Sequence, residues 1–115
     1  MSGRLVKDRI PALQCDKGAR PVIMVLDKNL FALELQKRIN TDLAMLNDSI
    51  GRRDMDSMIH NIANIQLCIK HLCEAWEIPQ NAVEHVYSVM FNEQGGYDAR
   101  LFQMDEKPEK PVSGA

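Results

Sequence analysis

The chain has no apolar run near the roughly 20 residues that a membrane-spanning helix needs. Its opening MSGRLVKDRIP also has no apolar stretch of the kind found in a secretory signal. Cysteine is scarce, since Cys15, Cys68 and Cys73 are the only ones and no two form a Cys-x-x-Cys pair. A sparse, odd set suits a reducing compartment better than a disulfide framework. We therefore expect a soluble cytoplasmic protein that does not enter a membrane.

Aromatic residues are few, and the basic residues gather in one place. Residues 1–21 hold five basic and two acidic side chains, although the whole chain carries a net charge of −2. Without interleaved aromatics, five charges make a poor footprint for duplex nucleic acid, so we expect none as a partner. A few lysines and arginines do suffice to grip the phosphates of one small nucleotide. The alternative is a solvated arm with scattered charges.

Apolar residues recur at intervals of three or four in two long stretches, 30–49 and 55–76, which predicts two amphipathic helices. The first stripe consists of Phe31, Leu35, Ile39, Leu43, Leu46 and Ile50. The second consists of Met55, Ile59, Ile62, Ile65, Ile69, Leu72 and Trp76. Gly51 with two arginines predicts a stop and Asp54 an N-cap, so the helices should fold back as an antiparallel hairpin.

The rest of the chain adds less structure. Pro11 disfavours helix at Ile10, which predicts a short extended N-terminal segment or a single turn. The run 21–26 is either a brief strand or an extended crossing, and Asp27 or Asn29 can cap the first long helix. Pro79 opens a third helix that ends before Gly95. We predict one all-α domain over 1–104 and a disordered tail over 105–115.

Two or three helices leave much apolar surface uncovered in a chain of this length. We therefore expect homo-oligomerisation, as a homodimer or tetramer, to complete a helical bundle. Cys68, His71 and Cys73 do not predict a zinc site, because neighbouring helical positions point in different directions.

Three segments of the chain resemble one family in order. RLVKDRIPAL at 4–13, KGARPVIMVLD at 17–27 and NEQGGYDARLF at 92–102 are similar to the opening and closing segments of the all-α nucleoside triphosphate pyrophosphohydrolases, the MazG-like and phosphoribosyl-ATP pyrophosphatase-like superfamily. The resemblance covers roughly residues 4–102. It implies an all-α fold and a magnesium-dependent phosphoanhydride hydrolase.

The chain departs from that family where its members hold magnesium. They use an E-E-x-x-E motif on one helix and E-x-x-D on the next, and the matching positions here are Asn40, Thr41, Ala44, Asn61 and Asn64. Magnesium needs carboxylates, and the hydrolysis needs the metal-bound water. We therefore predict no metal site, no catalytic residues and loss of hydrolysis. Removing the acids also removes their repulsion of phosphate, at about 4 kcal/mol per unit pair at 4 Å for a dielectric near 20.

The remaining candidate ligand-binding residues come from the matched ends of the chain. Lys7, Arg9 and Arg20 match cationic positions near the family's phosphate-facing opening. Gly95 and Gly96 let a backbone approach a ligand, Tyr97 offers a stacking face and Arg100 a phosphate contact. The alternatives are surface ion pairs with Asp8 or Asp16 for the cations and an ordinary helix end for Gly95. Asn61 and Asn64 could equally satisfy one another in a decayed site.

These observations predict a catalytically inactive MazG-like protein. It would bind and sequester a nucleotide or nucleotide-derived signal in a pocket at a subunit interface, without a cofactor. The first alternative is an active pyrophosphohydrolase that rebuilds a magnesium site from Asp42, Asp48, Asp54 or Asp56. The second is a structural or protein-interaction helical module without a ligand.

Overall fold

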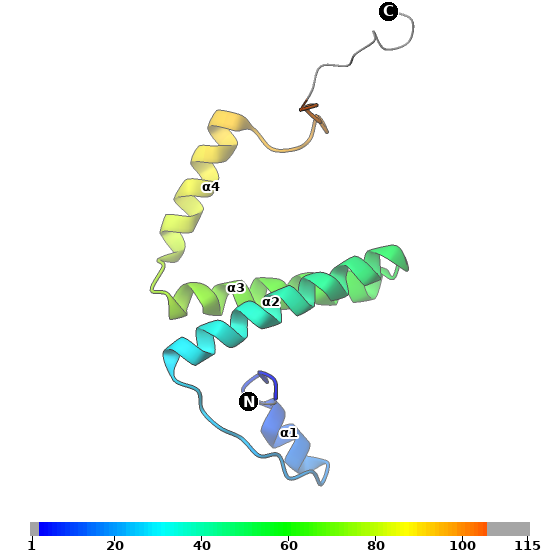
Figure 1. Ribbon diagram of the computed structural model, residues 1–115, viewed down its shortest axis with the longest axis vertical. Coiled ribbons are helices and arrows are strands. Elements are labelled where there is room, and N and C mark those ends of the chain that lie inside the picture. The colour runs from blue at the N-terminus through cyan, green and yellow to red at the C-terminus, as the bar shows by residue number, and fades with distance from the viewer. Residues whose placement is uncertain (1–2, 106–115) are drawn as a thin grey trace, which may run out of the picture. The chain divides into compact units, whose positions relative to one another are not determined.

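The computed structural model describes residues 3–105 of the chain. Within that range the protein is all-helical, as predicted, with helices α1 (Ile10–Asp16), α2 (Lys28–Gly51), α3 (Met55–Ala75) and α4 (Gln80–Gln94) (Figure 1). Of the predicted tail, residues 106–115 lie outside the described residues. None of the described helices is both long and apolar enough to cross a membrane.

The chain divides into two compact units, Met1–Gln80 and Asn81–Ala115. The first unit is built on α2 and α3, which run antiparallel beside each other as the predicted hairpin (Figure 1). The second unit contains α4, which ends at Gln94 because Gly95 takes a positive φ of 80°. Glycine adopts this conformation without steric cost, so the predicted helix end is confirmed.

Local capping explains where α2 begins and where the hairpin turns. The carboxylate of Asp27 accepts a 2.9 Å hydrogen bond from the backbone nitrogen of Leu30, and Asp54 caps α3 in the same way through Ser57. Both caps are among the residues predicted for this role. The stop itself differs from the prediction, because Gly51 remains helical and Arg53 takes the left-handed conformation with φ 54°.

The turn after α2 is a Schellman motif. The backbone nitrogen of Asp54 bonds to the carbonyl of Ser49, and that of Arg53 to the carbonyl of Ile50. The motif needs a left-handed residue, and its position is set by the hydrogen bonds rather than by the nearest glycine. The same arrangement ends α3, with Glu77 at φ 56°.

The first helix corrects a prediction about Ile10. Pro11 was expected to keep this residue out of a helix, yet α1 begins at Ile10 and places the proline in its first turn. The first-turn amides have no partner within a helix, so a proline there removes no hydrogen bond. Residues 21–27 form neither helix nor strand, so the brief strand, one of the two predicted alternatives, is not formed.

The core of the hairpin lies on a narrower seam than the predicted apolar stripes. Apart from Ala32, its buried members recur every seven residues, at 35, 42 and 49 on α2 and at 61 and 68 on α3. Opposing positions sum to 110, so Ser49 faces Asn61 and Asp42 faces Cys68, as their contacts show. Only Leu35 of the predicted stripe is buried on this seam. Other stripe residues, such as Leu43, Ile59 and Ile69, are exposed.

Candidate functional site

Two layers of the hairpin seam are polar. Asp42, Ser49 and Asn61 are all buried, with 0%, 1% and 4% of their surface exposed. Burying a polar group without a hydrogen-bond partner is costly, so each of these side chains needs one. The two layers differ in how completely their side chains are hydrogen-bonded.

The Ser49 and Asn61 layer is paired through the side chains of both residues. The amide nitrogen of Asn61 donates a 2.7 Å hydrogen bond to the hydroxyl oxygen of Ser49. The hydroxyl then donates a 2.8 Å bond to the carbonyl of Met45, one turn earlier. These hydrogen bonds orient the Asn61 side chain toward α2 and link the two helices. Asn61 therefore has a structural role, whatever else it contacts.

The Asp42 and Cys68 layer is incompletely paired. The guanidinium Nη2 of Arg38 lies 3.1 Å from Oδ1 of Asp42, but its hydrogens are not aligned, so Oδ1 accepts no hydrogen bond. The thiol of Cys68 approaches Oδ2 at 3.8 Å. Burial raises the pKa of the Cys68 thiol, and the neighbouring Asp42 carboxylate raises it further. The thiol consequently stays protonated and acts as a weak donor.

Asp42 is one of the four acids from which the alternative enzyme would rebuild a magnesium site. The structure places it in the seam facing α3. Its position follows from the seven-residue spacing with Leu35 and Ser49. It lines neither the cleft near the α2–α3 turn nor the cleft beside the N-terminal arm.

A cleft of about 590 Å³ opens along one side of the hairpin near the α2–α3 turn. Its lining includes Thr41, Met45, Asp48 and Ser49 from α2, Arg52 from the turn, and Asp56, Ser57, His60 and Asn61 from α3. Three of the five positions that matched the family's metal motifs are in this lining, namely Thr41, Ala44 and Asn61. The other two matched positions, Asn40 and Asn64, are not in this lining.

Arg52 neutralises part of the acidity of this cleft. Its guanidinium contacts Asp48 at 2.8 Å and Asp54 at 3.1 Å, and these hydrogen bonds raise the pKa of Arg52. The hydroxyl and backbone of Ser57 lower the pKa of Asp54, with a further contribution from Arg52. Of the cleft-lining acids, Asp56 has no such partner among the recorded ion pairs of the described residues.

The side of α2 that lines the cleft continues toward further cationic side chains. Positions 38, 41, 45, 48 and 52 recur every three or four residues and so follow one side of α2. Arg38 is therefore about one turn beyond Thr41 along this wall. Asn64, which is half-buried, follows Asn61 by three residues on α3 and continues the opposite wall.

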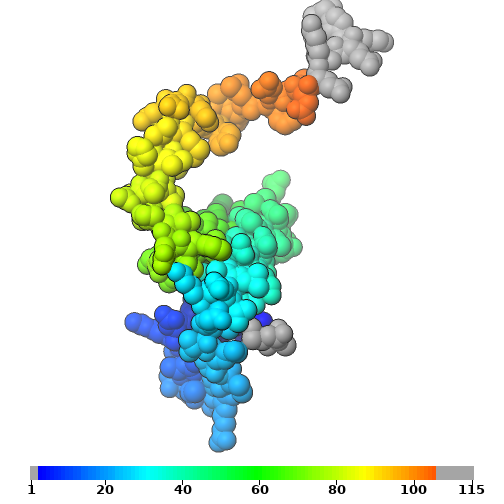
Figure 2. Space-filling model, turned by 60° about the vertical axis from the view of Figure 1, so that its left-hand side comes forward, coloured from blue at the N-terminus to red at the C-terminus, as the bar shows by residue number. Residues whose placement is uncertain are grey.

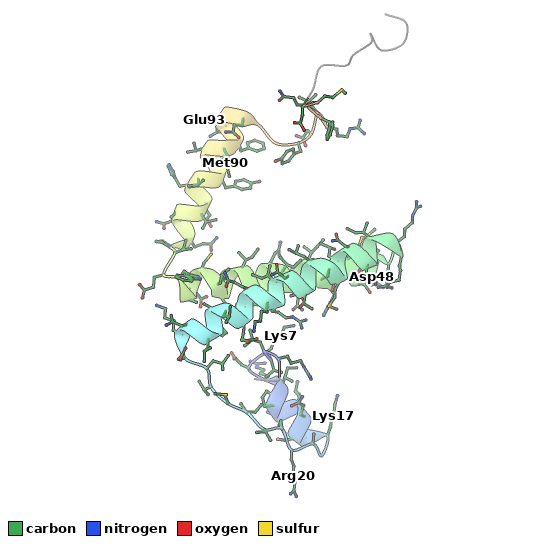
Figure 3. The ribbon with its side chains drawn as sticks, in the orientation of Figure 1. Lys7, Lys17, Arg20, Asp48, Met90 and Glu93 are labelled. Atoms are coloured by element: carbon green, nitrogen blue, oxygen red, sulfur yellow. The ribbon has the colours of Figure 1, made fainter. Side chains whose placement is uncertain are left out.

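Lys7 reaches this end of the hairpin from the N-terminal arm. The arm packs against the segment leading into α2 around a second cleft of about 620 Å³, where Lys7, Phe31 and Glu34 share the lining (Figure 2). Figure 3 shows Lys7 beside α2. Its charge, like that of Arg38, lowers the pKa of the Cys68 thiol against the larger opposing effects. Lys7 and Arg38 therefore act on the same layer of the seam.

The other candidates do not join these residues within the hairpin unit. Asn40 is exposed on α2 and lines neither cleft. Arg9 is exposed at the N-cap of α1, where its side chain makes no capping bond. Arg20 projects from the far end of the α1 segment, next to Lys17 and away from α2 (Figure 3).

The last four candidates belong to the second unit and follow α4. Gly95 forms the helix end, and a Cβ at Gly96 would lie 3.3 Å from the ring of Phe91. Tyr97 is 94% exposed and accepts a backbone hydrogen bond from Arg100, which takes a left-handed φ of 54°. The exposed ring of Tyr97 is the one feature here suited to stacking.

Sequence reasoning missed Arg38, Ser49 and Cys68 as site residues. A signal was present, because 35, 42 and 49 on one helix and 61, 68 and 75 on the next share a seven-residue spacing. Apolar periodicity alone selects the larger Leu, Ile and Met side chains instead. Small polar residues on the seam let the two helices approach closely, while the larger side chains stay at its flanks.

No group of three or more His, Cys, Asp or Glu side chains is placed to hold a metal ion among residues 3–105. Comparisons with protein-family models, with curated proteins and with solved structures found no match to this chain.

Proposed function

We propose that the hairpin cleft captures a nucleotide or nucleotide-derived signal without hydrolysing it, in a cytoplasmic protein related to the MazG-like pyrophosphohydrolases. Self-association belongs to the same proposal. The observation that supports this proposal is the order in which side chains follow one another along one side of the hairpin. Thr41, Ser49, Ser57 and Asn61 line the cleft. Arg38 lies about one turn beyond Thr41 on the same side of α2, and Lys7 lines the second cleft.

The cleft suits the nucleoside part of such a ligand. Thr41, Ser49, Ser57 and Asn61 supply donors and acceptors, and Met45 adds an apolar wall. A ribose and a base are rich in both kinds of hydrogen-bonding group. Since Arg52 pairs with Asp48, the negative charge that this carboxylate would present to a ligand is partly compensated.

The cations beyond the cleft suit the phosphates. Arg38 lies about one turn from Thr41, and its side chain remains partly exposed while it contacts Asp42. Lys7 makes no recorded ion pair within the described residues, so its ammonium is available to a phosphate oxygen. Charge-assisted hydrogen bonds to phosphate are about twice as strong as neutral ones.

The amide at 64 provides the sharpest residue test. Asn64→Asp places a carboxylate on the cleft side of α3, where it would repel phosphate when magnesium is absent. Asn40→Asp is the matched control, because it makes the same chemical change on an exposed surface outside the cleft. Asn61 is a poor probe because its side chain holds the hairpin together.

Thermal unfolding with a panel of nucleoside phosphates and cyclic dinucleotides, in EDTA, tests capture directly. A ligand at 100 times its Kd stabilises the protein by about 2.7 kcal/mol. We expect a shift that survives the chelator, is reduced in Asn64→Asp and is retained in Asn40→Asp. No shift with any of the probes contradicts capture and favours the helical module without a ligand.

A second candidate function has one observation in its favour. Asp48 and Asp56 both line the cleft, and an active pyrophosphohydrolase could use them to bind magnesium. Incubation of the purified protein with nucleoside triphosphates and magnesium separates the two functions. Pyrophosphate release that disappears in Asp56→Asn establishes the enzyme, whereas capture predicts no release above the blank.

A further inference from the structure

The segment that joins α1 to α2 exposes a run of apolar side chains. Residues 21–26, here called the linking segment, follow an open course without a helical turn (Figure 1). Val22 and Val25 are 99% and 93% exposed, and Ile23 and Met24 are exposed by more than half. Apolar runs rich in β-branched residues are typical of a strand, yet no strand forms within residues 3–105.

The backbone of the linking segment lacks the partner that a strand needs. No hydrogen bond joins the backbone of residues 20–26 to another backbone group of residues 3–105. The amides and carbonyls of a strand pair with those of a neighbouring strand, and the described part of the chain supplies none. A strand from outside the chain can therefore pair here without displacing an existing backbone bond.

Pro21 distinguishes the two edges that the linking segment offers to a partner. In a strand, the N–H and C=O of one residue point to the same side, and alternate residues point to opposite sides. Pro21 has no N–H, so the edge that contains it lacks a donor. The other edge, formed by Val22, Met24 and Leu26, is complete. A partner strand should therefore pair along this complete edge.

The linking segment also lines the second cleft, of about 620 Å³. Val6, Pro11 and Phe31 lie in the same lining and add apolar side chains to it. A strand that binds in this cleft can bury apolar side chains against them while its backbone pairs with the linking segment. The cleft therefore combines the two features by which strand addition works, namely backbone pairing and pockets for side chains.

The charged side chains of this cleft leave an excess of positive charge. Arg4 and Lys7 belong to none of the ion pairs recorded for residues 3–105. Asp8 and Glu34 are the acids of the lining, but Glu34 is paired with Lys37 at 3.2 Å. Two cations therefore face one acid that has no recorded partner, which favours an acidic ligand.

We propose that this cleft binds an extended segment of another protein, apolar in its middle and acidic at an end, which adds as a β-strand along the edge formed by Val22, Met24 and Leu26. The acidic side chain pairs with Arg4 or Lys7. This inference does not rest on the proposed capture of a nucleotide.

A titration of the isotope-labelled full chain, followed by NMR, tests the proposal with a defined probe. The probe is the end-blocked peptide Glu-Val-Thr-Val-Thr-Val-Glu, and the matched control is Lys-Val-Thr-Val-Thr-Val-Lys. We expect the acidic peptide to bind with a Kd of about 1 mM or below, and the lysine peptide about 10-fold more weakly. Hydrogen exchange should slow on binding at the amides of Val22, Met24 and Leu26, and not at those of Ile23 and Val25.

Two proline variants test the pairing edge. Met24→Pro removes an N–H from the complete edge, whereas Val25→Pro makes the same change on the edge that Pro21 already leaves incomplete. Both positions lie outside the helices and make no recorded backbone bond, so circular dichroism should show unchanged helix content. Met24→Pro should weaken binding of the acidic peptide about 10-fold, and Val25→Pro by less than about 2-fold.

Four outcomes overturn the proposal. They are equal weakening by the two prolines, equal binding of the two peptides, slowed exchange at Ile23 and Val25 instead, and no saturable shift up to about ten times the expected Kd. If Met24→Pro unfolds, the exchange pattern of the wild type decides. Slowed exchange at Val22, Met24 and Leu26 without peptide, rising with protein concentration, also overturns it, because a second copy then supplies the strand. Nucleotide binding enters none of these readouts.

Discussion

The side-chain amide of Asn61 donates a 2.7 Å hydrogen bond to the hydroxyl of Ser49, joining α3 to α2 one turn from the hairpin loop. The Ser49 hydroxyl in turn donates a hydrogen bond to the carbonyl oxygen of Met45. A residue that the resemblance places at a metal-ligand position is therefore committed to the fold. The effects of substitutions on ligand binding and on stability can therefore be separated only if Asn61 and Asn64 are substituted individually.

Asn61→Asp should destabilise the hairpin. Two oxygens would then face each other without a proton between them unless Ser49 gives up its bond to Met45, and the loss should be about 2 kcal/mol. Urea unfolding measures it. Asn40→Asp, on the exposed surface, should change stability by no more than about 0.5 kcal/mol. Equal effects of the two substitutions would contradict the role assigned to Asn61.

Arg38→Leu should destabilise the protein by about 2 kcal/mol, because it leaves the buried Asp42 carboxylate without its counter-charge. The double variant Arg38→Leu/Asp42→Leu removes both charges and should recover most of this loss. Urea unfolding of both variants and of Asp42→Leu completes a double-mutant cycle. Additive effects would show that the two side chains are not coupled.

Moving the glycine of the α2–α3 turn should stabilise the hairpin. Arg53→Gly relieves the left-handed backbone at φ 54°, and Gly51→Ala favours a helical position whose Cβ meets nothing within 4 Å. Each change should contribute about 0.5–1 kcal/mol. Thermal unfolding of the single and double variants tests this. Arg53→Ala keeps the strained backbone and should give no comparable gain.

Asp54 should make part of the free energy of unfolding depend on pH in the acid range. Its pKa is lower in the folded protein than in the unfolded chain, chiefly through Ser57. This contribution is therefore present above about pH 4 and is lost as the pH falls through the folded pKa. Asp54→Asn keeps an N-cap acceptor without the titration. Urea unfolding from pH 2.5 to 7 should show the wild type losing its advantage over Asp54→Asn at the acid end; a constant difference refutes the assignment.

The three thiols should react in the order of their exposure. Cys15 is exposed, Cys73 is partly buried, and Cys68 is buried with a raised pKa. Because the thiolate is the reactive form, a disulfide reagent at pH 8 should modify Cys15 first and Cys68 last. Mass spectrometry of the time course identifies the order. Early modification of Cys68 would show that the seam opens readily.

Local signals in the sequence predicted the helices well, because caps and breaks act over a few residues. Asp27, Asp54 and Gly95 each mark a boundary that the structure confirms. Ile10 was the exception, since the penalty that proline places on its predecessor is small enough for a first turn to form. The left-handed residue at 53 also escaped prediction, because hydrogen bonds to Ser49 and Ile50 select it.

The sequence by itself determined that the chain is helical and that two long helices turn back at Arg52–Asp54. Only the tertiary structure decided which side of each helix faces the other. Helical periodicity marks an apolar side, but the register of the hairpin placed Asp42, Ser49 and Asn61 on the seam instead. That choice depends on contacts between residues far apart in the chain, and no local pattern contains them.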